Sequence, residues 1–186
     1  IGQQRLNLPA TMPRYLGGQV LIESSSQSRA HSIANAKGIL QLSPSALNDC
    51  RIKPANHWHR LAQVDCALRL MQQNARNLEP TFKERFGHLP ADKQDQLFTL
   101  LLVQAYHGGV GRVVSLLNDE QLSKPAAYFA SEHENFSARD ILFGMIFHNL
   151  GRNRFGLASL YYVADVQLAT EAICTSDLLS DDAFCN

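Results

Sequence analysis

Apolar residues recur at the spacing of one buried helical face through most of this 186-residue chain. Such a period is typical of amphipathic helices. The pattern is clearest in four segments, namely residues 60–77, 92–106, 111–118 and 157–172. No alternating segment is long enough to predict a strand, and the polar stretch 24–34 is compatible with a small hairpin or a plain loop. We therefore expect a mostly α fold with at most a small hairpin.

Helix start and stop signals support this interpretation. Gly108 and Gly109 follow the second segment and predict its end, because glycine readily adopts the left-handed conformation found at helix C-termini. Ser137 precedes Asp140 by three residues, and an apolar run over residues 141–150 follows. That arrangement is typical of a capped helix N-terminus.

Charge and hydropathy exclude several classes of protein. The chain has 17 basic and 17 acidic residues and a formal net charge of zero. Nucleic-acid-binding domains normally carry a basic excess, so we expect no nucleic-acid partner. No stretch approaches about eighteen consecutive apolar residues, so we expect no membrane span. The chain begins with Ile1, and we expect it to be a processed protein or a part of a longer one. No linker or repeat divides it, which predicts a single domain over residues 1–186.

The four cysteines are Cys50, Cys66, Cys174 and Cys185. An even count without a Cys-x-x-Cys pair favours disulfides over zinc or redox chemistry. Three pairings are possible, and we expect Cys50–Cys66 with Cys174–Cys185, because each bridge then closes a short loop. The alternative is four unpaired thiols in a cytosolic protein. Disulfides favour a periplasmic or secreted protein. His57 and His59 lack a third ligand at metal-site spacing, so we expect no metal and no cofactor.

The most informative motifs lie in four blocks. The first is Glu23-Ser24. The second comprises Ala30-His31-Ser32, then Ala-Lys-Gly-Ile-Leu-Gln over residues 36–41, then Pro44. Residues 105–113 form the third block, Ala-Tyr-His-Gly-Gly-Val-Gly-Arg-Val, and residues 162–166 form the fourth, Tyr-Val-Ala-Asp-Val.

In order and spacing these blocks resemble the motifs of lytic transglycosylases and goose-type lysozymes. In that superfamily a Glu-Ser pair ends a helix, Ala-x-Ser and Gly-Ala-x-Gly-Leu-Met-Gln follow, and Ala-Tyr-Asn-Ala-Gly-Pro-Gly-Arg-Val comes later. The resemblance covers about residues 19–166. It implies a single lysozyme-like, two-lobed helical domain with a substrate groove. Residues 167–186 are then a C-terminal extension tethered by its cysteine pair.

Three positions depart from the family pattern. Asn35 stands where a glycine is usual, His107 replaces an asparagine that shapes the substrate site, and Val110 replaces a proline. These departures concern the details of substrate contact and leave the expected fold unchanged.

The resemblance also implies roles for individual residues. Glu23 is the expected catalytic acid, and substrate contacts are expected from Ser24, Gln41, Tyr106, His107 and Tyr162. Simpler roles stay open for each of these five: a helix-end cap for the serine, a structural amide for the glutamine, core packing for the tyrosines and a surface position for the histidine.

The residues themselves favour one mechanism. A carboxyl can protonate a departing glycosidic oxygen near neutral pH only if its surroundings raise its pKa. Glu23 follows the apolar residues 20–22, so we expect burial to raise the pKa of this carboxyl. A two-carboxylate glycosidase needs a second acid nearby, yet no Asp or Glu lies between Ser24 and Asn48. This favours a lytic transglycosylase that forms 1,6-anhydro-N-acetylmuramic acid with a single glutamate. Asp49 or Asp65 could still serve as a second acid.

Other functions remain open at this stage. The closest alternative is a hydrolytic muramidase, which includes the toxic domain of an antibacterial effector or phage protein. Such a domain would have an immunity or inhibitor protein as a partner. A third possibility is a catalytically silent glycan-binding module. In every case the expected partner is the peptidoglycan glycan strand.

Overall fold

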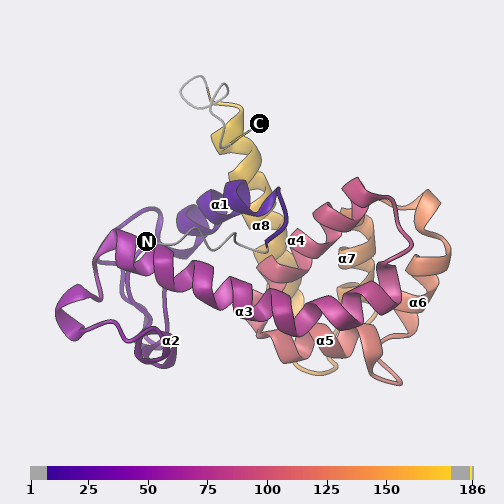
Figure 1. The fold of residues 1–186 in the computed structure, drawn as a ribbon, viewed down its shortest axis with the longest axis horizontal. Coiled ribbons are helices and arrows are strands. Elements are labelled where there is room, and N and C mark those ends of the chain that lie inside the picture. The colour runs from indigo at the N-terminus through magenta and orange to yellow at the C-terminus, as the bar shows by residue number, and fades with distance from the viewer. Residues whose placement is uncertain (1–7, 177–184, 186) are drawn as a thin grey trace. The chain divides into compact units, whose positions relative to one another are not determined.

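The computed structural model describes residues 8–176 and Cys185. In this part of the chain the regular elements are helices, and there is no strand, which confirms the expectation of a mostly α protein. The α-helices drawn in Figure 1 are α1 (Met12–Ser24), α2 (Pro44–Asp49), α3 (Arg60–Phe86), α4 (Ala91–Gly108), α5 (Val110–Asn118), α6 (Lys124–Ser131), α7 (Ala138–Phe147) and α8 (Leu157–Cys174). Two short 3-10 helices are η1 (Pro54–Asn56) and η2 (His133–Asn135).

The backbone contacts divide the chain into two compact units. One, the α4 unit, contains residues 8–12 and 74–164 of the described chain. The other, the α1 unit, contains residues 13–73, 165–176 and Cys185. Helices α3 and α8 each contribute one end to each unit.

Helix α4 forms the centre of the α4 unit. Half of its residues are buried, including the consecutive run Leu100–Val103. A helix that is apolar on most sides is stable only when other helices surround it. Helices α5 and α7 pack against α4, and α6 packs against α5 and α7 (Figure 1). The core of this unit therefore lies around α4.

Two local features order the helices around α4. Ser137 and Asp140 form the predicted capping box at the start of α7, with each side chain bonded to the other residue's backbone N–H. Gly144 allows α6 to approach α7, because a Cβ at this position would lie only 2.2 Å from the ring of Phe129. In addition, the Asp95 carboxylate accepts hydrogen bonds from Ala10 N (2.7 Å) and Thr11 Oγ1 (2.7 Å), which ties the N-terminal segment of this unit to α4.

In the α1 unit, helix α1 crosses α8 at Gly18. A Cβ on Gly18 would lie 2.3 Å from Thr170 Oγ1 and 2.5 Å from the Val166 carbonyl oxygen of α8. Only glycine permits this close backbone approach. Of the α8 residues at the crossing, Val166 ends the segment that resembles the family, and Thr170 belongs to the expected C-terminal extension, residues 167–186. Val166, Gln167 and Thr170 are buried. This end of α8 is therefore part of the packed structure of the unit.

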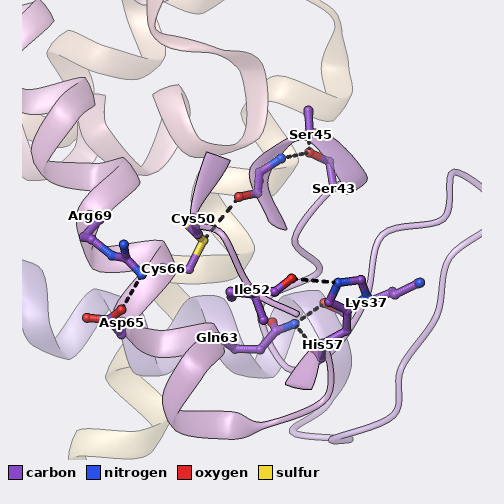
Figure 2. The surroundings of a disulfide bond; sticks show 11 residues. Lys37, Ser43, Ser45, Cys50, Ile52, His57, Gln63, Asp65, Cys66 and Arg69 are labelled. Atoms are coloured by element: carbon purple, nitrogen blue, oxygen red, sulfur yellow. Dashed lines mark hydrogen bonds and ion pairs between the residues drawn. A yellow bond between two sulfur atoms is a disulfide. The ribbon is translucent and has the colours of Figure 1, made fainter. Parts of the chain in front are cut away.

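The disulfides pair as predicted. Cys50, which follows α2, is bonded to Cys66 of α3 (Figure 2), and Cys174, the last residue of α8, is bonded to Cys185. Cys66 is fully buried and Cys50 is 6% exposed, and Cys66 Sγ lies 3.6 Å from the Ala46 carbonyl oxygen. The first bridge thus joins α2 to α3 inside the α1 unit.

Most predicted helices are confirmed, with differences in length. Helix α3 continues nine residues beyond the predicted end at Asn77 and includes Pro80. Proline removes one intrahelical hydrogen bond, but Leu78, Phe82 and Phe86 are buried on one face and their packing supports this last part of the helix. Helix α6 was not predicted, because it is only eight residues long and its periodic pattern is correspondingly short. The stretch 24–34 is a series of turns, with isolated bridges pairing Lys37 with His31 and Leu42.

None of the helices in the described ranges has the length and hydropathy needed to cross a membrane.

The Cys50–Cys66 bridge leads to a prediction about stability. Its cysteines are 16 residues apart, and closing a loop of this size is worth about 3 kcal/mol in the chain-entropy model. We expect the double variant Cys50→Ala/Cys66→Ala to lose about this much free energy of unfolding. Urea unfolding followed by circular dichroism measures the loss. An unchanged unfolding midpoint would show that the bridge contributes no net stability.

Candidate functional site

The predicted catalytic acid, Glu23, lies in the last turn of α1. The helix ends at Ser24, and the chain then turns through Ser25 and Ser26, which both have positive φ (50° and 63°). Glu23 is half-buried, whereas the preceding Leu21 and Ile22 are 37% and 40% exposed. The Glu-Ser pair ends a helix, as the resemblance to transglycosylases implies.

Ser24 connects the end of α1 to the loop that carries Gln41. Its hydroxyl donates to the Ile39 carbonyl at 2.9 Å and also lies 3.1 Å from the Val20 carbonyl of its own helix. The side chain is 9% exposed, and the bond to Ile39 is buried. A buried hydroxyl bond of this kind joins two segments that are distant in sequence. Ser24 is thus a structural link between the helix of Glu23 and the following loop.

The side chain of Gln63 in α3 holds this loop in place through hydrogen bonds to its backbone. Its side chain is fully buried, and its Nε2 donates to the carbonyl oxygens of Lys37 (2.8 Å) and His57 (2.6 Å), as Figure 2 shows. Its Oε1 accepts a hydrogen bond from Leu40 N at 3.2 Å. One amide therefore bonds to three backbone groups, and it joins the loop before α2 to the segment after it.

Gly38 is required where the loop passes over Gln63. Its φ is +79°, and a Cβ there would lie 2.3 Å from Gln63 Nε2. The close partner of Gly38 is thus a buried side chain of α3.

Gln41 lies in the tight turn that follows. Its φ is +45°, and both its backbone N–H and its Nε2 donate to the Gly38 carbonyl, at 3.1 and 3.0 Å. The side chain is half-buried, and its Oε1 is the amide atom left for an outside partner. Gln41 therefore has the structural role that the sequence left open, and its amide oxygen can still act as an acceptor.

The other candidate residues belong to the α4 unit. Helix α4 ends at Gly108, as predicted, and Gly109 adopts a φ of +88° before α5 begins. Just before this turn, the His107 ring stacks on Tyr162 of α8, with centroids 4.3 Å apart and planes 18° apart. Tyr162 is 8% exposed, and Tyr106 is half-buried. The structure thus brings His107 and Tyr162 into direct contact.

Burial and a nearby charge lower the pKa of His107. The larger cause is burial, since one face of its ring is covered by Tyr162, and the Arg112 guanidinium adds a smaller effect of the same sign. Arg112 is held in place because its Nε donates to the Gly108 carbonyl and its Nη1 to the Arg154 carbonyl at 3.2 Å. His107 is therefore expected to be neutral near pH 7, when its imidazole can both donate and accept a hydrogen bond.

The candidate residues form two sets. Glu23, Ser24 and Gln41 belong to the α1 unit, and Tyr106, His107 and Tyr162 belong to the α4 unit. A pocket of about 430 Å³ in the α4 unit contains none of them. Its lining includes Leu8, Pro9, Phe82, Gln94, Asp95 and Phe98. Within the described residues, no group of three or more His, Cys, Asp or Glu side chains is placed to hold a metal ion.

Sequence reasoning missed Gln63. A glutamine in a helical pattern normally indicates an exposed position, and only its burial and three backbone partners show otherwise. The one available signal was its place on the apolar face of the 60–77 pattern, three residues before Cys66 and four before Ala67.

Comparisons with protein-family models, with curated proteins and with solved structures give no match to this chain.

The loop over Gln63 leads to a second prediction. Gly38→Ala should lower the free energy of unfolding by about 2 kcal/mol or more, because alanine is strained at positive φ and its Cβ overlaps the Gln63 amide. Gly111→Ala is the matched control, since no atom lies within 4 Å of its Cβ position and alanine favours the helix. Thermal unfolding measures the stability of both variants. Equal stability of Gly38→Ala and Gly111→Ala would contradict the expected strain of an alanine at position 38.

The environment of His107 leads to a third prediction. Since its folded pKa lies below the ordinary value of 6.5, this residue lowers stability as the pH falls through the folded pKa and has no effect above about 6.5. Arg112→Gln should raise the pKa of His107 without restoring the ordinary value, because burial remains. Arg112→Lys keeps the charge and should change the pKa less. Titration of the histidine protons by NMR measures the pKa of His107 in both variants. An equal change of this pKa in Arg112→Gln and Arg112→Lys would exclude the charge of Arg112 as its cause.

Proposed function

We propose that this protein is a peptidoglycan lytic transglycosylase with Glu23 as its single catalytic carboxyl. The observation that carries the proposal is the connection between two motif blocks inside the α1 unit. Glu23 ends α1 as the family motif requires, and the adjacent Ser24 is bonded to Ile39 in the loop of Gln41. Residues that match the family's catalytic and substrate-contact motifs are thus joined by a buried hydrogen bond. The fold that we propose is the lysozyme-like, two-lobed helical domain with a substrate groove.

The chemistry needs one carboxyl that acts twice. Glu23 in its protonated form donates its proton to the glycosidic oxygen between N-acetylmuramic acid and N-acetylglucosamine, and the bond from that oxygen to C1 of the muramic acid breaks. The resulting carboxylate then takes the proton of the C6 hydroxyl of the same muramic acid. That hydroxyl oxygen bonds to C1 and closes the 1,6-anhydro ring. Glu23 ends protonated, and no water is consumed.

The carboxylates of the α1 unit support this route over hydrolysis. No acidic residue lies between Ser24 and Asn48. Asp49 is exposed at the end of α2, and Asp65 is exposed and forms an ion pair with Arg69 at 2.5 Å. A two-carboxylate mechanism would need a second acid about 5–9.5 Å from the first, and the exposure of both carboxyls and the ion pair of Asp65 favour the route that needs only Glu23.

The remaining candidate residues fit substrate contact. The exposed His107 ring, which is stacked on the buried Tyr162, offers its other face to a ligand, and this suits the apolar face and hydroxyls of an N-acetyl sugar. Gln41 can accept a hydrogen bond through Oε1. Two disulfides are compatible with an extracytoplasmic location, where the peptidoglycan strand is the substrate. An immunity or inhibitor protein is the expected partner if the chain is a toxic effector domain.

The fourth prediction tests this function directly. Mass spectrometry of fragments released from purified peptidoglycan should find 1,6-anhydro-muramic acid ends. Glu23→Gln should lower the rate of release at least about 100-fold, because it removes the general acid and base while keeping the size of the side chain. Glu171→Gln, which changes an exposed glutamate of α8, is the matched control and should keep full activity.

Other outcomes would replace the proposal. Products that are one water heavier, with reducing ends, would identify a hydrolytic muramidase. Binding to cell-wall sacculi without release of any fragment would identify a silent glycan-binding module. Full activity of the Glu23→Gln variant would exclude Glu23 as the acid.

A further inference from the structure

The α1 unit contains a basic segment that the net charge of the chain conceals. Between Ser24 and Val64 there are five basic residues and one acidic residue, Asp49, although the whole chain is neutral. The basic residues are Arg29, Lys37, Arg51, Lys53 and Arg60. Four of them are exposed, and Lys37 is half-buried. Anionic groups should therefore be attracted to this part of the molecule.

The single tryptophan of the chain, Trp58, lies within this segment. Lys37 Nζ lies over its ring, 5.9 Å from the centroid. The ring of His31 meets it edge to face, with centroids 6.1 Å apart and planes 87° apart. Trp58 is half-buried, so part of the indole remains accessible to a ligand.

Lys37, which lies over Trp58, and Arg60, which follows Trp58 by two residues in the sequence, are held by hydrogen bonds that leave their positive charges available. Lys37 and Leu42 exchange two backbone hydrogen bonds of 3.0 Å, and Gln63 binds the Lys37 carbonyl. Figure 2 shows the Lys37 side chain extending away from Gln63. Arg60 Nε donates to Ser28 Oγ at 2.6 Å, which leaves the other guanidinium nitrogens as donors.

Among the described residues, no carboxylate forms an ion pair with Lys37 or Arg60. In the described part of the chain, ion pairs join Arg69 to Asp65 and Lys83 to Glu79, and neither pair includes Lys37 or Arg60. A lysine held over a partly accessible indole can bind an anion that is attached to an apolar surface.

We propose that Trp58 and Lys37 form a binding site for a carboxylate-bearing sugar ligand, in which the carboxylate binds Lys37 and the apolar sugar face contacts the indole. Arg60, two residues after Trp58 in the sequence, adds to the positive charge of the segment. The ligand identity rests on the proposed function, since peptide-substituted muramic acid carries both N-acetyl sugar faces and carboxylates. A neutral N-acetylglucosamine oligomer would leave the charge of Lys37 without a role. The site therefore selects charged, peptide-bearing glycan over neutral glycan.

Trp58 itself provides the measurement. Because it is the only tryptophan, fluorescence excited at the red edge of the absorption band reports on this site alone. The probe is a soluble disaccharide-tetrapeptide muropeptide, titrated into the Glu23→Gln variant so that no cleavage occurs. We expect a saturable fluorescence change with the muropeptide and none with a neutral N-acetylglucosamine tetramer. Lys37→Gln should weaken muropeptide binding roughly fivefold to tenfold, as loss of one charge-assisted contact predicts.

Two controls make the result specific. Lys124→Gln removes an exposed lysine of α6 in the α4 unit and should leave the affinity unchanged. Circular dichroism verifies that the Lys37 and Lys124 variants keep the fold. Equal affinity for the neutral tetramer, or an unchanged affinity in the Lys37→Gln variant, would overturn the site. Binding of a single-stranded oligonucleotide in preference to the muropeptide would also overturn it, because cations beside an aromatic ring can bind nucleic acid.

The two proposals fail in distinguishable ways. Muropeptide binding at Trp58 with no cleavage by the native protein would retain this site and reject the transglycosylase. Cleavage to anhydro products with no response of Trp58 to the muropeptide would retain the transglycosylase and reject this site.

Discussion

The buried amide of Gln63 is the interaction on which the arrangement of the α1 unit depends. A single side chain satisfies backbone groups of Lys37, Leu40 and His57, which come from two loops separated by α2. A buried amide costs free energy unless its hydrogen bonds are made, so this position selects the one loop conformation that makes them all. Gly38 must then be glycine, because no Cβ fits between the loop and the amide.

The positions of the candidate residues in the α1 unit follow from the hydrogen bonds of Gln63. With the loop held by Gln63, the Ile39 carbonyl accepts the hydroxyl of Ser24 and connects the loop to the end of α1, where Glu23 lies. The same loop turns back at Gln41, whose amide bonds to Gly38, and exposes Lys37 toward Trp58. The candidate acid, a polar acceptor and a cationic group are thus all set by one buried network. The Cys50–Cys66 bridge adds a covalent link between α2 and α3 in the same unit.

Net charge alone would be misleading for this molecule. A total of zero suggests no preference for charged ligands, yet the distribution between segments is uneven, and a ligand responds to the local charge. A similar contrast applies to His107. The residue is exposed, but burial of one ring face against Tyr162 and, to a smaller extent, the nearby Arg112 lower the pKa of the imidazole. In both cases the chemistry depends on which groups lie close together in the folded chain.

The sequence by itself determined the local features of the structure. Helical periodicity predicted four of the helices, Gly108 and Gly109 predicted the end of α4, and Ser137 with Asp140 predicted the start of α7, because these signals depend on backbone conformation within a few residues. The cysteine spacing predicted both disulfides, since short loops close at low entropic cost.

Only the tertiary structure decided which side chains are buried and which segments meet. Gln63 looks like a surface residue in sequence, Gly18 gives no sign of its crossing with α8, and nothing local places Lys37 over Trp58. These contacts join residues separated by long stretches of chain, so they depend on packing and hydrogen bonding between segments, which no local pattern encodes.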